Sequence, residues 1–179
     1  MGVAGKILAV LGSARRQSDT EKLLHILLND VVYTRLDLLH YNIAPYAYNG
    51  SYPENDNFSD VVTALLQHDT IIWATPVYWY AMSGLLKTCF DRLTDLVTFR
   101  KALGRKLKGK NTFLVAVGAD AELPEGFIIP FKSTAAYLNM HFGYYFYAAT
   151  SNLHHVDLLH SQAKTFIANI MATKNQPDK

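Results

Sequence analysis

The chain alternates between short continuous apolar runs and longer stretches in which apolar residues recur every three or four positions. Continuous apolarity predicts strands that are covered on both faces, and the three-to-four spacing predicts amphipathic helices. The pattern predicts five strands, at 6–11, 31–38, 69–76, 111–118 and 143–150. It predicts a helix after each strand, at 19–30, 58–68, 85–103, 130–142 and 154–174. Asn57 is the candidate N-cap of the helix at 58–68.

Strands that alternate with helices pair in parallel, cross over in the right-handed sense and carry helices on both faces of the sheet. Five strands of this kind fit the α/β flavodoxin-like fold, a doubly wound parallel sheet with strand order 2-1-3-4-5. At 179 residues the chain has the size of one domain. We therefore predict a single domain over residues 1–179, with a polar tail from about 172 onward.

Ligands of open α/β sheets bind beyond the carboxyl ends of the strands, where the winding direction reverses. For the order 2-1-3-4-5 this point lies between strands 1 and 3. The loops at 12–20, 75–84 and 118–126 should therefore meet at one edge of the sheet. They are also the chemically unusual loops of the sequence, so we expect a ligand there.

The first of these loops, "GSARRQSDT", combines hydroxyl groups, two arginines and the start of a helix. A helix N-terminus has unpaired N–H donors and a positive partial charge, which together suit a phosphate. The same residues also suit a plain capped helix, with Ser18 and Glu21 in a Ser-x-x-Glu capping box. From the residues alone both interpretations stand, and they are compatible with each other.

The second loop, "TPVYWYAMSG", follows the third strand, which we expect to end at Pro76. Its aromatic residues Tyr78, Trp79 and Tyr80 are consecutive, so in an extended segment their side chains alternate between two sides. Burial of all three in the core is therefore unexpected. Exposed rings suit a flat, π-rich ligand, whereas burial in the core or in a subunit interface is the alternative for any single ring.

Charge and composition narrow the classes of partner. Lysine and arginine number 17 and aspartate and glutamate 15, and the formal charge of +2 is too small to indicate nucleic acid. The basic run "RKALGRKLKGK" at 100–110 is interpreted as a solvated helix end and turn. No apolar stretch approaches the roughly 18–20 residues of a membrane span, and "ILAVL" is short for a signal peptide. We expect a cytoplasmic protein that binds neither nucleic acid nor a membrane.

Cysteine and histidine usage excludes several kinds of site. Cys89 is the only cysteine, which excludes an internal disulfide and any cysteine-based zinc or iron–sulfur centre. It lies on the apolar stripe of a predicted helix and is interpreted as a buried structural thiol. His154 and His155 are adjacent and His160 lies five positions further on, which is not metal-ligand spacing. We predict no metal site; the sequence contains no Gly-x-Ser-x-Gly nucleophile elbow, and nothing in it points to a dispersed Ser-His-Asp set.

At the two loops the sequence resembles a known family. "GSARRQSDTEKLL" is similar to the GSxRxxSxT phosphate loop of the flavodoxin-like NAD(P)H-dependent FMN reductases. "ATPVYWYAMSGLLKTCFDRLTDL" closely resembles the TPVYWYxMSGxLKxxxDR segment of the same family. The likeness continues through "GRKLKGK" and "PFKSTAAYLNM", so it covers most of the chain in the right order. It implies non-covalent FMN as the cofactor and NAD(P)H as the electron donor.

The resemblance assigns roles to residues in all three loops. Those that would hold the FMN phosphate are Ser13, Arg15, Ser18 and Thr20. Those that would border the isoalloxazine ring are Pro76, Val77, Tyr78, Trp79, Met82, Ser83 and Gly84. Gly118 begins the loop that would close the other side of the ring. Because FMN carries the chemistry in such enzymes, no catalytic side chain is implied.

The sequence departs from the family pattern in several places. Ala14 stands where the family often has Pro, and Asp19 stands where it often has Asn, which puts a carboxylate beside the phosphate. The cysteine cluster of the family's iron–sulfur members is absent. The segment "GADAELPEG" at 118–126 carries acids where small polar residues are expected.

The function implied is that of an FMN-dependent oxidoreductase. It would take hydride from NAD(P)H and pass two electrons to a quinone, a nitro- or azo-aromatic or a flavin in a ping-pong cycle. One alternative is a flavodoxin-like electron carrier or redox sensor, although a pI near 8.6 is unlike the acidic carriers. Another is a flavin-free interaction module whose aromatic residues form a contact patch.

A homodimer is also expected, because a second subunit often covers a ring face that is left open at a sheet edge. The segments that would take part are "FGYYFY" and the long loop at 40–57.

Overall fold

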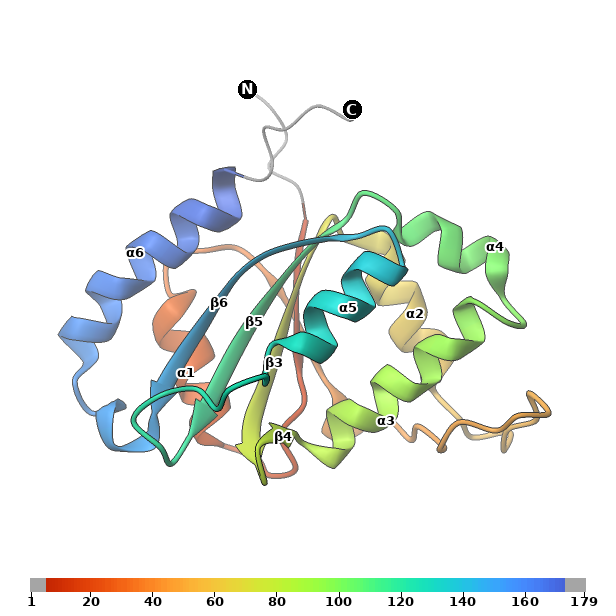
Figure 1. Cartoon of the computed structure of the whole chain (residues 1–179), viewed down its shortest axis with the longest axis horizontal. Coiled ribbons are helices and arrows are strands. Elements are labelled where there is room, and N and C mark those ends of the chain that lie inside the picture. The colour runs from red at the N-terminus through yellow and green to blue at the C-terminus, as the bar shows by residue number, and fades with distance from the viewer. Residues whose placement is uncertain (1–5, 173–179) are drawn as a thin grey trace.

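The computed structural model describes residues 6–172 and shows one sheet with helices on both faces (Figure 1). The sheet contains five parallel strands in the predicted order, β2-β1-β3-β5-β6. They are β1 (Ile7–Leu11), β2 (Thr34–Asp37), β3 (Thr70–Tyr78), β5 (Asn111–Gly118) and β6 (His141–Ala149). A further two-residue strand, β4 (Ala81–Met82), pairs with β3 in the antiparallel sense and was not predicted. The predicted fold class is confirmed.

The helices form a layer on each side of the sheet (Figure 1). One layer consists of α1 (Asp19–Leu27) and α6 (Val156–Ala172), which lie side by side. The other contains α2 (Phe58–Gln67), α3 (Gly84–Arg92) and α5 (Ile129–Tyr137), with the short α4 (Lys101–Gly104) at its margin. Of the predicted polar tail, residues 173–179 lie outside the described residues.

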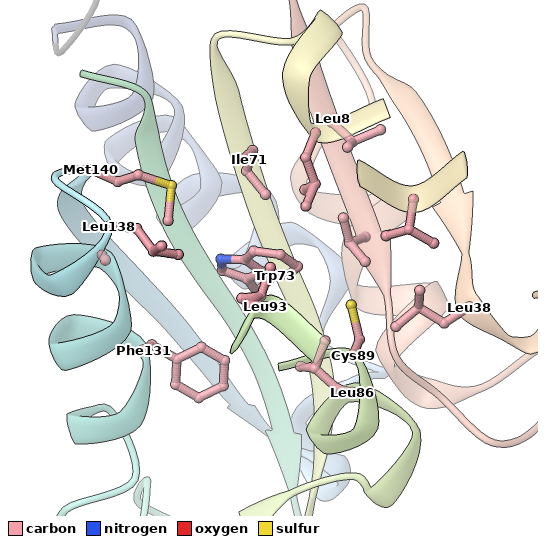
Figure 2. Close-up of a cluster of buried hydrophobic side chains, with 14 of the residues drawn as sticks. Leu8, Leu38, Ile71, Trp73, Leu86, Cys89, Leu93, Phe131, Leu138 and Met140 are labelled. Carbon is pink, nitrogen blue, oxygen red and sulfur yellow. The ribbon is translucent and has the colours of Figure 1, made fainter. Parts of the chain in front are cut away.

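The sheet divides the apolar core into two clusters. The larger cluster joins one face of the sheet to α2, α3 and α5 and includes Trp73, Leu86 and Phe131 (Figure 2). The smaller cluster packs α1 and α6 on the opposite face through residues such as Leu24 and Phe166. Strands β1, β3 and β5 are therefore covered on both faces, which explains their continuous apolar runs. Burying each large apolar side chain stabilises the fold by about 1.5–3 kcal/mol.

Cys89 lies inside the larger cluster and is fully buried (Figure 2). Burial raises the pKa of its thiol to about 12, although the charge of nearby Arg92 acts in the opposite direction. The thiol is therefore protonated at neutral pH, as expected for a structural cysteine. Within residues 6–172, no cluster of His, Cys, Asp and Glu side chains has the arrangement of a metal site. The same residues include no helix long and apolar enough to cross a bilayer.

The prediction that the third strand ends at Pro76 is wrong. Pro76 pairs with Val117 of β5, and β3 continues to Tyr78. On the other side, β1 ends at Leu11, and the Gly12 N–H donates to the Ala74 carbonyl at 2.7 Å. Strand β1 does not extend beyond that hydrogen bond, so pairing with β1 requires no N–H donor at position 76. Proline lacks this donor and therefore fits here without the loss of a hydrogen bond between strands.

The single helix predicted over 85–103 is also wrong. Helix α3 ends at Arg92, a 3₁₀ turn follows over Leu93–Leu96, and α4 begins only at Lys101. Asp95 turns inward, where its carboxylate accepts a hydrogen bond from Arg92 Nε at 3.1 Å. Its carbonyl accepts the Arg100 N–H at 2.7 Å, which closes the chain into a turn. The apolar spacing persists through this bend, so it does not reveal the break.

Two smaller predictions change for local reasons. The second strand begins at Thr34 rather than 31, and Asp37 ends it by capping the following 3₁₀ turn with its carboxylate. Asn57, the expected cap of α2, makes no side-chain cap hydrogen bond. The carboxylate of Asp56 accepts the Phe58 N–H at 3.0 Å instead.

The helix predicted over 130–142 is shorter in the structure. It ends at Tyr137, and Asn139 adopts a left-handed conformation with φ of 55°. Asparagine tolerates this region better than most residues. The chain then enters β6 at His141, two residues before the predicted start of the strand.

Candidate functional site

The three predicted loops meet at the carboxyl edge of the sheet, where the strand arrows end in Figure 1. The first and second loops are joined directly, because the Ser83 hydroxyl donates a hydrogen bond to the Gly12 carbonyl. The second and third approach each other where β3 and β5 end: a Cβ added to Gly118 would lie 3.2 Å from Val77 Cβ. The expected meeting of the loops is confirmed.

Ser83 is a structural link between these loops. Besides its bond to Gly12, its Oγ accepts the Leu86 N–H at 3.1 Å, and its own N–H donates to Thr75 Oγ1 at 3.0 Å. The approach is so close that a Cβ on Gly12 would lie 2.7 Å from Leu86 Cβ. Glycine at position 12 therefore lets β1 come against the start of α3. The side chain of Ser83 is occupied by these contacts.

Helix α1 begins with the predicted cap. The Ser18 Oγ accepts the Glu21 N–H at 3.1 Å. The reciprocal half of the capping box is missing, because the Glu21 carboxylate pairs with Arg35 of β2 instead. The preceding residue, Gln17, is left-handed with φ of 51°. The loop thus turns sharply into a helix N-terminus whose first donors are only partly satisfied.

Several donors near this helix start have no partner in the described part of the chain. The backbone N–H groups of residues 13–17 donate no hydrogen bond among residues 6–172. Thr20 is 1% exposed, and its Oγ1 has no hydrogen-bond partner within the same residues. Ser13 is equally buried. A buried hydroxyl without a partner costs about 1–3 kcal/mol, so this cradle fits a bound anion such as the FMN phosphate.

Asp19 is held by two cations beside this cradle. The Arg15 Nη2 lies 2.8 Å from one carboxylate oxygen and the Lys22 Nζ lies 3.4 Å from the other. The structure therefore pairs Arg15, a residue expected at the phosphate, with the carboxylate that was expected to oppose the phosphate. The Arg15 side chain is 64% exposed, so it is free to change partner.

The aromatic residues of the second loop form a tight, exposed turn between β3 and β4. The exposed fractions of Tyr78, Trp79 and Tyr80 are 49%, 93% and 70%, so none of the three is buried in the core of the chain. Trp79 and Tyr80 are both left-handed, with φ of 47° and 64°. Two-residue hairpins of this shape normally contain Asn and Gly, because other side chains are strained there. The strain presents two large rings to solvent at the carboxyl edge of the sheet.

Other residues predicted for this wall lie at the edge with their side chains elsewhere. Met82 packs into the larger core cluster, and Pro76 is buried in β3. A Cβ added to Gly84 would meet nothing within 4 Å, so the surface there is open. These residues offer backbone rather than side-chain groups to a ligand.

Tyr147 of β6 is a residue of this edge that the sequence did not indicate. Its hydroxyl donates to the Asp120 carbonyl at 2.6 Å, and a Cβ on Gly118 would lie 2.7 Å from the same hydroxyl. Burial, followed by the Asp120 charge, raises the pKa of Tyr147, so the phenol is protonated at neutral pH. The only signal in the sequence was its membership of an aromatic strand.

Comparison with known proteins identifies the family. A family model described as NADPH-dependent FMN reductase matches residues 5–150. YwqN of Bacillus subtilis strain 168, named as a candidate NAD(P)H-dependent FMN-containing oxidoreductase, is 28% identical over 122 residues. That alignment covers 64% of this chain and 67% of YwqN.

Solved structures share the fold. The Trp repressor binding protein of Bacillus subtilis superposes with a TM-score of 0.70 and 25% identity, over 88% of this chain and 96% of that chain. General stress protein 14 of Treponema denticola, solved in complex with FMN, has a TM-score of 0.66 and 22% identity, over 94% and 99%. The family match, which spans most of the chain, carries the conclusion: this chain belongs to the NADPH-dependent FMN reductases, oxidoreductases with FMN as cofactor and NAD(P)H as electron donor.

Proposed function

We propose that FMN binds at the carboxyl edge of the sheet, with its phosphate at the N-terminus of α1. The observation that carries this proposal is the buried hydroxyl of Thr20, which has no hydrogen-bond partner within residues 6–172, beside N–H groups of residues 13–17 that donate no hydrogen bond within the same range. Ser13 and Ser18 add hydroxyl donors, and Arg15 adds a cation when it leaves Asp19. The positive end of the α1 dipole favours a dianion at the same place.

The isoalloxazine ring would then lie between the aromatic turn and the loop after β5. The residues that would border it are Pro76, Val77, Tyr78, Trp79, Met82 and Gly84 on one side and Gly118 on the other. Ser83 acts indirectly, because its hydroxyl keeps the phosphate loop and the start of α3 in contact. The N-terminus of α3 places positive partial charge near the ring, which favours negative charge developing there.

The residues at this edge would hold FMN, which would supply the redox chemistry: acceptance of a hydride from NAD(P)H, with release of NAD(P)⁺, and transfer of two electrons, with protons from the hydride and from solvent, to a quinone, a nitro- or azo-aromatic or a free flavin. The protein itself would hold and orient the flavin and leave one face of its ring exposed. The exposed rings of Trp79 and Tyr80 offer stacking area for planar molecules. Because donor and acceptor use the same open face, the first product leaves before the acceptor enters. The cycle is therefore ping-pong.

The phosphate assignment is tested with Thr20→Val and with the matched control Thr63→Val. The Thr63 hydroxyl donates a hydrogen bond to the Ser59 carbonyl within α2. Flavin fluorescence titration measures the Kd of FMN and of riboflavin, which lacks the phosphate. Loss of a hydrogen bond to a charged group costs about 1.5–3 kcal/mol, so Thr20→Val should weaken FMN binding by roughly tenfold or more. Riboflavin binding should not change. Equal losses for both flavins would contradict a phosphate at Thr20.

The cycle is tested by steady-state and stopped-flow kinetics of the FMN-loaded protein. We expect NADH or NADPH to bleach the flavin absorbance without an acceptor, and double-reciprocal plots against a quinone to be parallel. Intersecting lines would contradict the ping-pong order. Bound FMN that neither nicotinamide reduces would contradict the proposed hydride transfer.

We also propose that the enzyme is a cytoplasmic homodimer. Tyr144 of β6 and Tyr48 of the loop before α2 are exposed large side chains in the two segments expected at the contact. A second copy over them would remove apolar area from water. Light scattering after size-exclusion chromatography should give twice the mass of the chain, and a monomer at working concentration would contradict the dimer. Cell fractionation tests the compartment.

A further inference from the structure

The loop at 119–126 forms one wall of the proposed ring site, and its acidic residues depart from the small polar residues expected from the family. It carries Asp120, Glu122 and Glu125, and none of the three forms an ion pair among residues 6–172. Leu123 and Phe127 pack against the larger core cluster and anchor its far end. The near end, directly after Gly118, has no such anchor, because its residues are exposed.

One hydrogen bond holds this near end. Within the described chain, the Tyr147 hydroxyl donates to the Asp120 carbonyl at 2.6 Å, and residues 119–123 make no other hydrogen bond. A groove of about 570 Å³ lies on the outer side of the loop, between it, β6 and α6, with Tyr145 among its lining residues. The loop therefore has room to move outward once this bond is absent.

The same hydroxyl lies where the ends of two central strands meet. Tyr147 pairs with Ala116 of β5, and its ring packs against the larger cluster, so its direction is set by the sheet. A Cβ on Gly118 would lie 2.7 Å from the hydroxyl and 3.2 Å from Val77 Cβ. Tyr147 thus connects the carboxyl ends of β3 and β5 to the exposed loop that follows β5.

We propose that Tyr147 is the positioning residue that holds the loop at 119–126 as the second wall of the ring site. The proposal rests on the proposed FMN site. Without the hydroxyl, the Asp120 carbonyl loses its donor and the near end of the loop becomes mobile. The ring end of the flavin then loses part of its enclosure, whereas the phosphate end, at the N-terminus of α1, is unaffected.

The tether itself is tested in the flavin-free protein. Tyr147→Phe removes only the hydroxyl, and Tyr145→Phe is the matched control on the same strand, because the Tyr145 hydroxyl makes no hydrogen bond within residues 6–172. A glutamate-specific protease, with cleavage sites mapped by mass spectrometry, reports the opening of the loop at Glu122 and Glu125. Cleavage there should be several-fold faster in Tyr147→Phe and unchanged in Tyr145→Phe. Equal cleavage of all three proteins would overturn the tether.

The consequence for the site is tested by binding. Tyr147→Phe should raise the Kd of FMN and of riboflavin by the same factor, about three- to tenfold, as expected for one lost hydrogen bond. Tyr145→Phe should bind both flavins like the wild type. If wild type binds FMN and Tyr147→Phe binds it equally well, the positioning role is wrong and the site stands. If wild type binds no flavin, the proposed site fails, and the protease experiment still reports on the tether.

Discussion

Asp19 illustrates how one side chain acquires its meaning from its neighbours. The sequence places its carboxylate beside the expected phosphate, where like charges repel. In the structure Arg15 and Lys22 compensate that charge, and the carboxylate in turn engages the Arg15 guanidinium. Asp19 also lies in the first turn of α1, where a negative charge favours the helix. In the proposed FMN site, Asp19 would therefore compete with the phosphate for Arg15.

Asp19→Asn should tighten FMN binding. The change removes a charge near the phosphate and frees Arg15, and such exposed interactions are worth about 0.5–1 kcal/mol, which corresponds to roughly two- to fivefold in Kd. Fluorescence titration at low and high ionic strength measures the gain, which should shrink with salt. Asp60→Asn, in the first turn of α2, is the control and should have no effect. Unchanged or weaker FMN binding in Asp19→Asn would contradict the competition.

At the scale of elements, the turn between β3 and β4 is where local preference and structure disagree. Consecutive aromatic residues favour extended backbone, yet Trp79 and Tyr80 take left-handed conformations. Pairing of Val77 with Met82 and of Tyr78 with Ala81 requires this tight reversal. The fold thus stores strain at the carboxyl edge of the sheet, where the rings are exposed.

Replacing the turn with its preferred residues, Trp79→Asn with Tyr80→Gly, should stabilise the protein and impair the enzyme. Relief of the left-handed strain contributes about 1–2 kcal/mol at each of the two positions, and little buried area is lost because both rings are exposed. Urea unfolding of the flavin-free protein measures the gain, and acceptor reduction measures the loss. Tyr78→Asn, exposed but outside the left-handed pair, is the control. A stability no higher than that of the control would contradict stored strain.

At the scale of the whole molecule, a buried cation joins segments far apart in the chain. The Arg92 side chain is 1% exposed, and its Nη1 lies 2.5 Å from Asp56 Oδ2 and 3.0 Å from the Ala44 carbonyl. Its Nε donates to Asp95, which also accepts the Tyr52 hydroxyl at 2.7 Å. The network fastens the long loop before α2 to the end of α3. Removing one partner of such a network leaves a buried charge without compensation.

Arg92→Met should therefore lower the free energy of unfolding by about 3–5 kcal/mol. Lys87→Met is a control on the same helix, because Lys87 pairs with Asp91 at 2.6 Å on the exposed surface. Such surface pairs contribute about 0–1 kcal/mol. Urea denaturation compares both variants with the wild type. Similar losses of unfolding free energy in the two variants would show that the buried network contributes no more to stability than a surface ion pair.

The same network predicts part of the acid sensitivity. Burial alone would raise the pKa of Asp56, but the hydrogen bond from Arg92 and those from the backbone outweigh it and hold the pKa below its usual 3.8. Stability from this carboxylate is therefore complete above pH 3.8 and is lost as the pH falls through the lower folded-state value. Asp56→Asn should be less stable at neutral pH and should lose less on acidification, as measured by urea unfolding across pH. An unchanged pH dependence would argue against this role.

Much of the fold was predictable because burial of an element's face imposes a local pattern. The five parallel strands and their order follow from runs such as "ILAVL" and from the helices between them. The breaks were not predictable for the same reason. Asp95 interrupts a helical pattern only because its carboxylate accepts hydrogen bonds from Arg92 and Tyr52 in the interior. Pro76 remains in its strand only because the neighbouring strand β1 has already ended.

The candidate site divides in the same way. Hydroxyls before a helix start and consecutive aromatic residues are local signals, so the capped helix start after β1 and the exposed aromatic turn could be predicted from the sequence. Tyr147 was missed because its role depends on which loop lies above β6. Its hydroxyl and the Asp120 carbonyl that it reaches are 27 residues apart in the chain.

By itself, the sequence determined the order of strands and helices, the edge at which the loops gather and the family to which the chain belongs. These are properties of local periodicity and of contiguous motifs. Only the tertiary structure decided how the loops are held: Ser83 to Gly12 across 71 positions, and Arg92 to Asp56 across 36. Hydrogen bonds between distant residues depend on where packing places their backbones, and no local pattern records that position.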